Sequence, residues 1–312
     1  LDAGHGGKDY GATYHGNIEK KISLNTVLKV GEILAKESNI EVVYTRKTDV
    51  FIELNERANI ANRSKGHLFV SMHCNANDNQ EASGNETYVM GVTRNAANLE
   101  VAKKENAVVT LESDYKIKYD GFDPKSPESV MGISIMQEEN IQQSIDIAGK
   151  VQQAFTKFTT SKNRGVKQAG FVVLKATSMP SVLLEIGFLS NREEENYLKT
   201  DIGKQKIAES IFNGFTEYKK KIEQLPETVA EVTNKPTSNP KEPIYQFWIQ
   251  IAATPNPISK TDSLLKNSPF NIEQLKENGL YKYRTFTFSQ IKEVLKARDK
   301  MFAAGFKDAF II

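Results

Sequence analysis

Residues 67–77 read HLFVSMHCNAN, a short apolar run that ends in polar residues. This composition, bounded by polar residues, favours a strand over 67–73. Side chains alternate across a strand, so Phe69, Ser71 and His73 are predicted to share one face. His73 then stands at the carboxyl end of the strand, where ligands gather in open α/β sheets.

Outward from this strand, the spacing of apolar residues alternates between two periods. Spacings of three and four predict helices, whereas short β-branched runs predict further strands. Helices are predicted over residues 20–37, 53–65 and 141–158, and a last helix is predicted over 207–222. Strands are predicted over 40–46, 85–90, 171–174 and 181–188. Strands that alternate with helices indicate an α/β fold, a mostly parallel sheet with helices on both faces.

The composition limits the possible functions. The 312 residues carry 41 basic and 39 acidic side chains, and no dense run of Lys and Arg indicates a nucleic-acid partner. No stretch of about 18 apolar residues predicts a membrane span. The single cysteine, Cys74, excludes an intrachain disulfide. The sequence starts at Leu1 inside a predicted strand, so any signal peptide is expected to lie outside it.

The character of the sequence changes after residue 222. Residues 225–243 hold four prolines and little apolar periodicity, which predicts an extended linker over 223–243. Beyond the linker, a small α+β domain is predicted over 244–312. Its expected elements are a strand within 245–254, a helix near 271–278, a strand over 280–288, a helix over 289–304 and a final strand. The catalytic chemistry is expected in the first domain, 1–222.

Two histidines and one glutamate are predicted to meet at the carboxyl edge of the sheet. His5 follows a strand end among glycines, which allow a tight turn. Glu19 precedes the helix that leads from the His5 segment to the next strand. A carboxylate there also has an ordinary explanation, because it complements the helix dipole. Together with His73, these side chains would form a His₂Glu set, which is a catalytic zinc pattern with one position left for water.

Glu185 interrupts an otherwise apolar run, SVLLEIGF, over 181–188. An unpaired carboxylate in a buried strand costs on the order of several kcal/mol. A structural salt bridge would offset that cost. Alternatively, Glu185 is a general base beside a metal-bound water, which explains its place near the end of the strand.

Four further residues are expected near this edge of the sheet or close to it in sequence. His15 could compete with His5 as a ligand, although it lies in a separate glycine-flanked loop. His67 is expected at the surface, and Cys74 is expected to pack on the face opposite His73. Asn75 is polar at the edge of the site and is a candidate for binding substrate.

The motifs DAGHGGKDYGA (2–12), EK with LN shortly after it (19–25), FVSMHCNAN (69–77) and LLEIGFLSN (183–191) follow one another within residues 1–222. In this order they resemble the zinc-dependent N-acetylmuramoyl-L-alanine amidases of the amidase_3 family. The resemblance implies that His5, Glu19 and His73 hold Zn²⁺ and that Glu185 is the catalytic carboxylate. It also implies a twisted sheet flanked by helices.

The resemblance further implies a substrate and a reaction. The enzyme would hydrolyse the amide between N-acetylmuramic acid and the L-alanine of peptidoglycan stem peptides. Zinc would polarise a water and the scissile carbonyl, and Glu185 would move a proton from the water to the leaving amine. A periplasmic location and a role in cell-wall remodelling and daughter-cell separation are also implied.

Residues 111–140 form a polar section where some relatives that act in cell separation carry an inserted helix. In those relatives the helix plugs the zinc site until a partner protein removes it. An inhibitory insert in this chain could cap zinc through one of four carboxylates: Glu112, Glu128, Glu138 or Glu139. An ordinary surface excursion is the alternative.

The second domain, 244–312, resembles a SPOR domain, a module that binds glycan strands of peptidoglycan stripped of peptides. FWIQIAAT (247–254) matches the usual opening strand and AAGFKDAFII (303–312) the usual ending. Aromatic residues that could stack on sugars are Tyr245, Phe247, Tyr281, Tyr283 and Phe286.

Two other functions remain compatible with the same residues. One is a zinc peptidase that cuts within stem peptides. The other is a non-catalytic peptidoglycan-binding regulator, against which the presence of all four key residues argues.

Overall fold

The structure, a computed structural model, describes residues 1–93, 95–133, 140–223, 248–254, 256–259, 262–277, 280–288, 291–306 and 309–311. The chain divides into two compact units, Leu1–Thr228 and Val229–Ile312. The predicted linker, 223–243, lies outside the described residues except at its first position.

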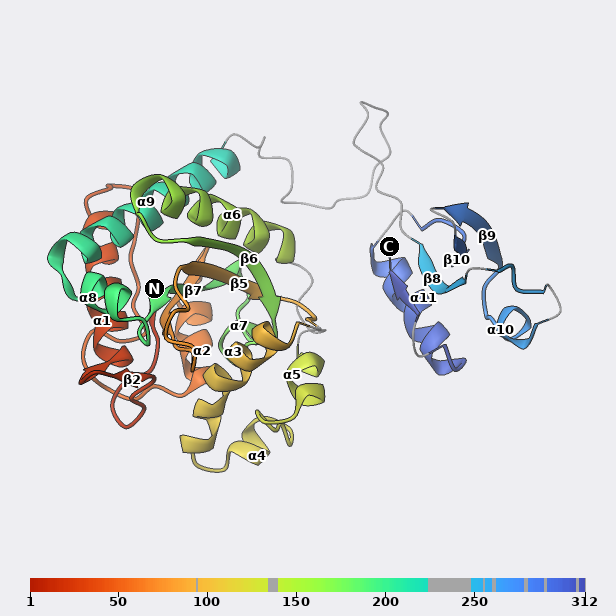
Figure 1. Ribbon diagram of the computed structural model, residues 1–312, viewed down its shortest axis with the longest axis horizontal. Helices are drawn as coiled ribbons and strands as arrows, with labels where there is room; N and C mark the ends of the chain where they lie inside the picture. The colour runs from red at the N-terminus through yellow and green to blue at the C-terminus, as the bar shows by residue number, and fades with distance from the viewer. Residues whose placement is uncertain are drawn as a thin grey trace. The chain divides into compact units, whose positions relative to one another are not determined.

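A five-stranded sheet with the order β1-β4-β7-β5-β6 forms the centre of the larger unit (Figure 1). The strands are β1 (Asp2–Ala3), β4 (Phe69–Asn75), β7 (Ser181–Phe188), β5 (Asn85–Met90) and β6 (Asn163–Ala169). β5 pairs antiparallel with β7, and the other neighbouring pairs are parallel. The predicted mostly parallel sheet is confirmed.

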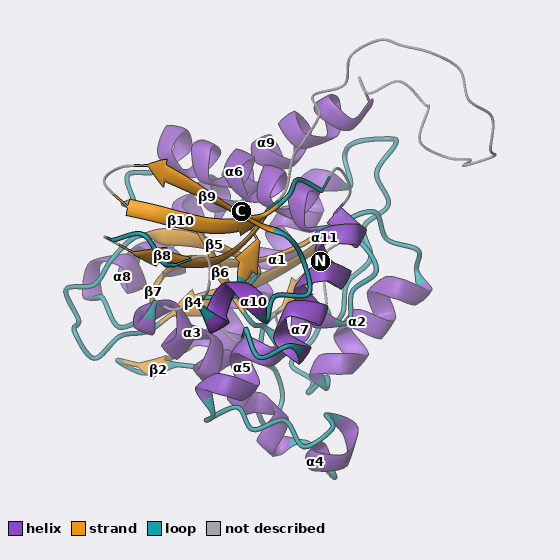
Figure 2. Ribbon diagram, turned by 90° about the vertical axis from the view of Figure 1, so that its right-hand side faces the viewer, coloured by secondary structure: helices purple, strands orange, loops and turns teal. Residues whose placement is uncertain are grey.

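Helices cover both faces of this sheet, as Figures 1 and 2 show. One face carries α1 (Glu19–Leu34), α6 (Ile141–Phe158) and α9 (Asp201–Glu223). The other carries α2 (Leu54–Arg63), α3 (Ala96–Asn106) and α7 (Val172–Lys175). Val70 and Met72 pack in the core on the α1 face of the sheet, and Phe69 packs in the core on the α2 face. The predicted alternation of side chains along β4 is therefore confirmed.

A long excursion between β5 and α6 adds to the second face. It contains α3, the 3₁₀ turn η1 (Ala107–Leu111), α4 (Tyr115–Lys118) and α5 (Pro127–Ile133). Val109, Phe122 and Val130 join the core on this face, so the excursion is packed against the sheet. α8 (Arg192–Lys199) links β7 to α9.

Two predicted strands of this unit are wrong. Residues 40–46 run beside β1 through two backbone bonds with Leu1, which is too few for a continuous ladder. Residues 171–174 are buried but mainly form the helical turn α7. A short apolar run does not by itself distinguish a strand from a buried helical turn.

The smaller unit has the element order βαββαβ and a four-stranded sheet in the order β11-β8-β10-β9. Its elements are β8 (Ile249–Thr254), α10 (Ser263–Lys266), β9 (Ile272–Glu277), β10 (Leu280–Thr285), α11 (Ile291–Ala303) and β11 (Phe310–Ile311). The helix predicted near 271–278 is wrong, because Ile272–Glu277 form β9 and pair with β10. Their apolar residues, Ile272 and Leu275, have a helix-like spacing that misled the prediction.

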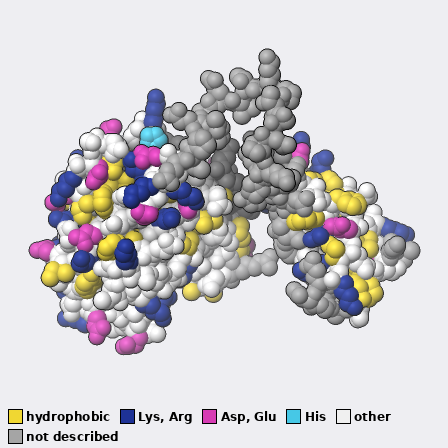
Figure 3. Space-filling model, turned by 90° about the horizontal axis from the view of Figure 1, so that it is seen from above, with side chains coloured by type: hydrophobic (Ala, Val, Ile, Leu, Met, Phe, Trp, Pro, Cys, Tyr) yellow, Lys and Arg dark blue, Asp and Glu magenta, His cyan; other side chains and the backbone are white. Residues whose placement is uncertain are grey.

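Acidic and basic side chains are interspersed over the face of the larger unit shown in Figure 3. This mixture agrees with the small net charge of +2. Within the described ranges, none of the helices combines the length and apolar character needed to cross a bilayer.

Candidate metal centre

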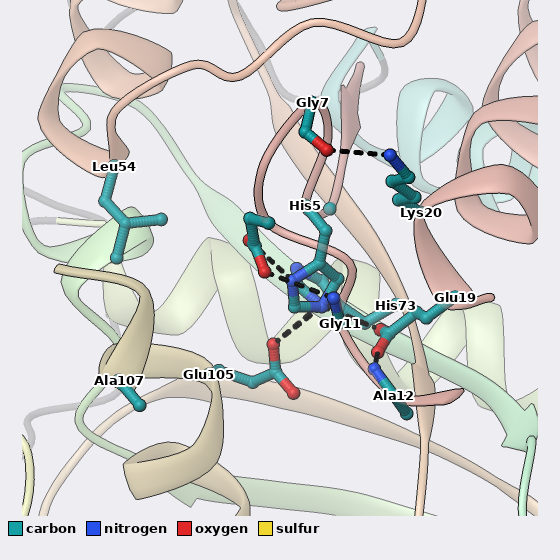
Figure 4. A network of polar contacts seen from close by, with 12 residues as sticks. His5, Gly7, Gly11, Ala12, Glu19, Lys20, Leu54, His73, Glu105 and Ala107 are labelled. Carbon is teal, nitrogen blue, oxygen red and sulfur yellow. Dashed lines mark hydrogen bonds and ion pairs between the residues drawn. The ribbon is translucent and has the colours of Figure 1, made fainter. Parts of the chain in front are cut away.

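Four side chains converge at the carboxyl edge of the sheet: His5, Glu19, His73 and Glu105 (Figure 4). Each offers one ligand atom, and these atoms lie within 4.8 Å of one another. His5 Nε2 lies 3.0 Å from Glu19 Oε1 and 3.2 Å from His73 Nδ1. Glu105 Oε2 lies 2.8 Å from His73 Nδ1 and 3.4 Å from His5 Nε2. The three side chains predicted from the sequence thus meet, together with a carboxylate that was not predicted.

The His5 loop is held in an uncommon backbone conformation. His5 has a φ of 61° and Gly6 a φ of 131°, so the chain turns sharply after β1. Gly6 and Asp9 exchange two backbone hydrogen bonds that close the turn. His5 Nδ1 donates to Asp9 Oδ2 at 2.7 Å, which leaves Nε2 directed at the cluster. A carboxylate behind a ligand histidine fixes the ring and raises its basicity.

Gly4 brings the loop close to His73. A Cβ atom on Gly4 would fall 2.4 Å from the His73 ring, which is a severe clash. The glycine is therefore required for the two histidines to approach each other, and their ring centroids are 4.8 Å apart.

Glu19 is the first residue of α1, and both of its oxygens accept backbone hydrogen bonds. Oε1 accepts from Cys74 N at 2.9 Å and Oε2 from Ala12 N at 2.8 Å. The carboxylate thereby joins the end of β4 to the loop that follows His5. A helix-dipole role alone does not explain these contacts, because they involve other elements of the fold.

The buried charges of the cluster balance one another. Burial opposes a charge on His73, but Glu105 and Glu19 outweigh it and raise the pKa of His73 to about 10. Burial likewise opposes a charge on Glu105, but His73 lowers the pKa of Glu105 to about 2. The pKa of His5 is raised, against the effect of burial, chiefly by Glu19. Two imidazolium protons thus neutralise two carboxylates, and one divalent cation can replace both protons.

The donor set fits a small divalent ion. Ligands about 2.0–2.2 Å from a tetrahedral ion lie about 3.3 Å from one another. The separations that involve a histidine nitrogen run from 2.8 to 3.4 Å, and the donors are imidazole nitrogens and carboxylate oxygens. The residues present therefore fit a tetrahedral divalent ion.

Glu185 lies on β7 beside His73, its partner in the strand register. Its side chain is 0% exposed, and neither carboxylate oxygen has a hydrogen-bond partner among the described residues. Burial, and then the charge of Glu105, raises the pKa of Glu185 well above its ordinary value. The salt bridge considered for this residue is not observed in the described part of the chain, so Glu185 is a buried, unpaired acid next to the cluster.

Glu86 lies opposite Glu185 on the neighbouring strand β5 and has the contrary environment. It accepts hydrogen bonds from Asn75, Tyr88, Arg164 and Lys167. Although burial opposes it, Lys167 and Arg164 lower the pKa of Glu86. Asn75 donates to Glu86 at 2.7 Å and accepts from Ala76 N at 2.8 Å, so its side chain supports the end of β4.

The carboxylate that enters the cluster belongs to Glu105 on α3, outside the predicted insert 111–140. Glu112 was predicted as a cap but accepts instead from Leu54 N and the Tyr119 hydroxyl. Glu128 is exposed and accepts from Ser126, so it does not cap the cluster either. Glu138 and Glu139 lie outside the described residues. The excursion begins directly after β5 rather than at residue 111, so it includes α3 and Glu105.

The side chains of His15, His67 and Cys74 do not belong to the cluster. His15 occupies the turn of the hairpin β2 (Thr13–Tyr14) and β3 (Asn17–Ile18), where its Nδ1 lies 3.2 Å from Glu195. His67 is exposed, as predicted. Cys74 packs in the core on the face opposite His73, and burial raises the pKa of its thiol.

Three residues at this site were not identified from the sequence: Asp9, Glu86 and Glu105. Asp9 carries a weak signal, since it follows His5 by four residues in the glycine-rich turn. Glu86 sits in a short strand between Asn85 and Thr87, where a charged residue between two polar ones is unremarkable by pattern. Glu105 follows two lysines in a polar helix, so no local pattern distinguishes it from a solvent-exposed side chain.

An α/β fold with a buried His/Glu cluster and an unpaired carboxylate at the sheet edge defines a class, the metal-dependent hydrolases. Residues 1–217 match the family model described as N-acetylmuramoyl-L-alanine amidase. The chain belongs to this family, and its larger unit is an amidase domain.

Individual relatives agree with this assignment. N-acetylmuramoyl-L-alanine amidase AmiC of Escherichia coli O6:H1 is 34% identical over 227 residues, which cover 70% of this chain and 52% of AmiC. The chain thus spans about half the length of that relative. The crystal structure of an N-acetylmuramoyl-L-alanine amidase from Clostridium difficile 630 matches with a TM-score of 0.53 and 26% identity, over 70% of this chain and 94% of that one. The CwlD amidase of Clostridioides difficile, solved in complex with the GerS lipoprotein, matches with a TM-score of 0.52 and 25% identity, over 70% and 96%.

Replacing the carboxylate behind His5 should weaken metal binding. Asp9→Asn removes the charge that orients the His5 ring, and losses of this kind cost about 10- to 100-fold in metal affinity. Competition with a chromophoric chelator measures the zinc dissociation constant. Asp201→Asn, at the exposed start of α9, is the matched control and should leave the constant unchanged. Equal affinities of Asp9→Asn and the native protein would show that Asp9 does not support the ligand.

Proposed function

We propose that this protein is a zinc-dependent amidase that cleaves the bond between N-acetylmuramic acid and L-alanine in peptidoglycan. The observation that carries the proposal is the juxtaposition of the His5–Glu19–His73 cluster with the unpaired Glu185 on the adjacent strand. Family membership of residues 1–217 supports the substrate class.

His5, Glu19 and His73 would hold the ion. Two imidazole nitrogens and one carboxylate oxygen suit Zn²⁺, and a catalytic zinc site keeps its fourth position for water or substrate. A zinc ion bound there would supply Lewis-acid polarisation of the scissile carbonyl and of a water.

Glu185 would carry the proton. Its two oxygens have no partner among the described residues, so either one is available to accept a proton from water. Its raised pKa, caused first by burial and then by Glu105, favours holding that proton until the leaving amine takes it. Glu185 lies on the central strand β7 rather than on a loop, and this fixes the position of its carboxylate.

Digestion of purified cell-wall sacculi tests the reaction. We expect products with free L-alanine amino termini and intact N-acetylmuramic acid by mass spectrometry. Glu185→Gln should lower the rate by about 10²- to 10⁴-fold, the usual contribution of a general acid–base group. The variant should still bind zinc, because Glu185 is not among the clustered ligands.

Glu86→Gln is an informative comparison, since Glu86 faces Glu185 but is already fully hydrogen-bonded. It should retain more activity than Glu185→Gln. New amino termini within the stem peptide would instead identify a peptidase, and zinc binding without any cleavage would identify a non-catalytic regulator.

The described conformation corresponds to a closed form of the enzyme in this proposal. Glu105 Oε2 is 2.8 Å from His73 Nδ1, where a water or substrate oxygen would have to approach the ion. A site with four protein ligands is typical of structural zinc, whereas catalytic zinc retains an open position. The inhibitory role proposed for the insert is therefore assigned to α3 and Glu105.

Apolar packing and a few hydrogen bonds hold α3 over the site. Ala102 and Asn106 are buried, and Leu99 and Val101 pack partly buried against the core of this face. Asn106 anchors the end of the helix, donating to Gly170 O at 2.7 Å and accepting from Val172 N at 2.8 Å. Lys104 adds a bond to Ala76 O at 3.0 Å. A partner protein that binds the excursion could withdraw Glu105 from the cluster, and CwlD, which is solved in a complex with GerS, is a relative with a protein partner.

Glu105→Ala should therefore raise the basal rate of sacculus digestion, by about tenfold or more at saturating zinc, because the fourth position becomes open. Release of soluble muropeptides over time is the measurement. Glu100→Ala, an exposed change on the same helix, is the control and should leave the rate unchanged. An unaltered rate in Glu105→Ala would refute inhibition by α3 without affecting the proposed reaction.

The proposed substrate also supports a proposal for the compartment and the role. Peptidoglycan lies outside the cytoplasmic membrane, so the enzyme would act in the periplasm, in cell-wall remodelling and daughter-cell separation. Recovery of the protein only from the cytoplasmic fraction of its native cells would contradict this location.

The smaller unit is proposed to bind glycan strands of peptidoglycan as a SPOR-like domain. Its βαββαβ order and four-stranded sheet agree with a small α+β binding module. Of the aromatic residues considered, Tyr283 is in the core, Tyr281 is partly buried and Phe286 is 59% exposed. Tyr245 and Phe247 lie outside the described residues. Phe286 is thus the best-placed candidate for sugar stacking.

Phe286→Ala in the full chain should weaken binding to sacculi stripped of stem peptides, by about tenfold, because stacking of one ring is lost. Sedimentation of the protein with such sacculi is the measurement. Phe302→Ala, an exposed aromatic change on α11, should not alter binding. Equal binding by Phe286→Ala and the native chain would remove Phe286 from the proposed surface.

A further inference from the structure

Two arginines lie buried beneath the loop that carries His5. Arg57 is 1% exposed and Arg46 is 3% exposed, which is rare for this residue type unless it is paired. Arg57 pairs with the buried Asp2, with Nη1 2.9 Å from Oδ1. Arg46 has no such carboxylate: its hydrogen bonds in the described structure all go to backbone carbonyls. Two buried cations therefore lie under the loop, and Asp2 is the carboxylate with which one of them forms an ion pair.

The carbonyl groups that they bind include those of Ala3, Gly4 and His5, at and next to a clustered ligand. Arg57 donates from Nη1 to Ala3 O at 2.6 Å and from Nη2 to His5 O at 2.8 Å. Arg46 donates from Nε to Ala3 O at 3.0 Å and from Nη2 to Gly4 O at 2.7 Å. Every carbonyl from Ala3 to His5 thus accepts a hydrogen bond from a buried guanidinium.

Arg46 also connects this loop to the second ligand. The same Nη2 that donates to Gly4 O donates to Lys20 O at 2.8 Å, and Lys20 directly follows Glu19. One nitrogen therefore links the backbone before His5 to the backbone after Glu19.

These hydrogen bonds hold the backbone of the His5 loop in a strained conformation. His5 has a φ of 61°, a conformation that costs a non-glycine residue on the order of 1 kcal/mol or more. The turn must nevertheless stay close to β4, since Gly4 N donates to Met72 O at 3.0 Å and a Cβ atom on Gly4 would clash with the His73 ring. A planar guanidinium with five N–H donors can bind several carbonyls in fixed directions, whereas a lysine ammonium is a point charge.

A contribution to folding stability does not by itself explain why Arg46 and Arg57 are buried. A buried charge costs several kcal/mol to desolvate, and apolar side chains of similar volume often serve stability as well or better. Burial, followed by the nearby charge of Arg57, lowers the pKa of Arg46 to about 10, so Arg46 remains charged at neutral pH.

We propose that Arg46 and Arg57 are positioning residues of the metal centre, which hold the backbones of His5 and Glu19 in the geometry that binds the ion. The inference rests on the proposed zinc-dependent function and extends it to residues that contact neither ion nor substrate. Arg46 is the sharper case, because its removal leaves no buried carboxylate unpaired.

Arg46→Lys and Arg46→Met in the full chain test the proposal. Both should weaken zinc binding about 10- to 100-fold, as losses of groups that support ligands do. The dissociation constant is measured with Zn²⁺ against a chromophoric chelator, and ligand geometry from the visible spectrum of the Co²⁺-loaded protein. Arg63→Met is the matched control on α2, since Arg63 is 63% exposed and pairs only with Glu56 in the described structure. It should change neither quantity.

Urea unfolding of the metal-free proteins separates positioning from general stability. Zinc affinity and a Co²⁺ spectrum like those of the native chain, in folded Arg46→Lys and Arg46→Met, would overturn the proposal, whether or not their metal-free stability is lowered. If Arg46→Met does not fold, Arg46→Lys and Arg57→Lys, which retain the charge, decide the question. A native protein that binds no zinc would refute the proposed function itself, which is a different outcome.

Discussion

The crowding of like charges at one sheet edge is the constraint on which this structure depends. Glu19, Glu105 and Glu185 are clustered around two imidazoles in a region shielded from water. Carboxylates so placed repel one another in a medium of low dielectric, and only cations close to them offset the repulsion. Protons on the imidazoles, or one divalent ion in their place, provide that offset. The backbone amides that bind Glu19 and the arginines beneath His5 then keep the ligands from moving apart.

Neighbouring strands give two similar side chains opposite properties. Glu86 and Glu185 face each other across β5 and β7, yet Glu86 has two cationic partners and Glu185 has no hydrogen-bond partner among the described residues. Pairs of titratable groups whose environments separate their pKa values are typical of catalytic sites. The sheet thus gives Glu86 charged partners that favour its ionised form, whereas Glu185, one strand away, has no hydrogen-bond partner among the described residues.

The sequence allowed the α/β class, the central strands and the convergence of His5, Glu19 and His73 to be predicted, because each depends on local periodicity and on where strands end. The environment of Glu185 followed from an acid inside an apolar run. Glu105 could not be found in this way, since its burial arises from how a distant excursion folds back over the edge of the sheet. The buried arginines were missed for the same reason, as their partners are backbone carbonyls that leave no trace in side-chain patterns. Residues 171–174 and 272–277 show that pairing and burial override short local spacings.

A carboxylate supplied by the chain itself differs from a dissolved inhibitor. In the proposed closed form, Glu105 would compete for the cluster at an effective concentration of roughly millimolar or higher, set by its connection to β5 and not by the cell. Free carboxylic acids at micromolar levels would rarely take its place, and dilution of the protein would not release it. Such a site would be controlled by a partner that binds the excursion and not by the concentration of a metabolite.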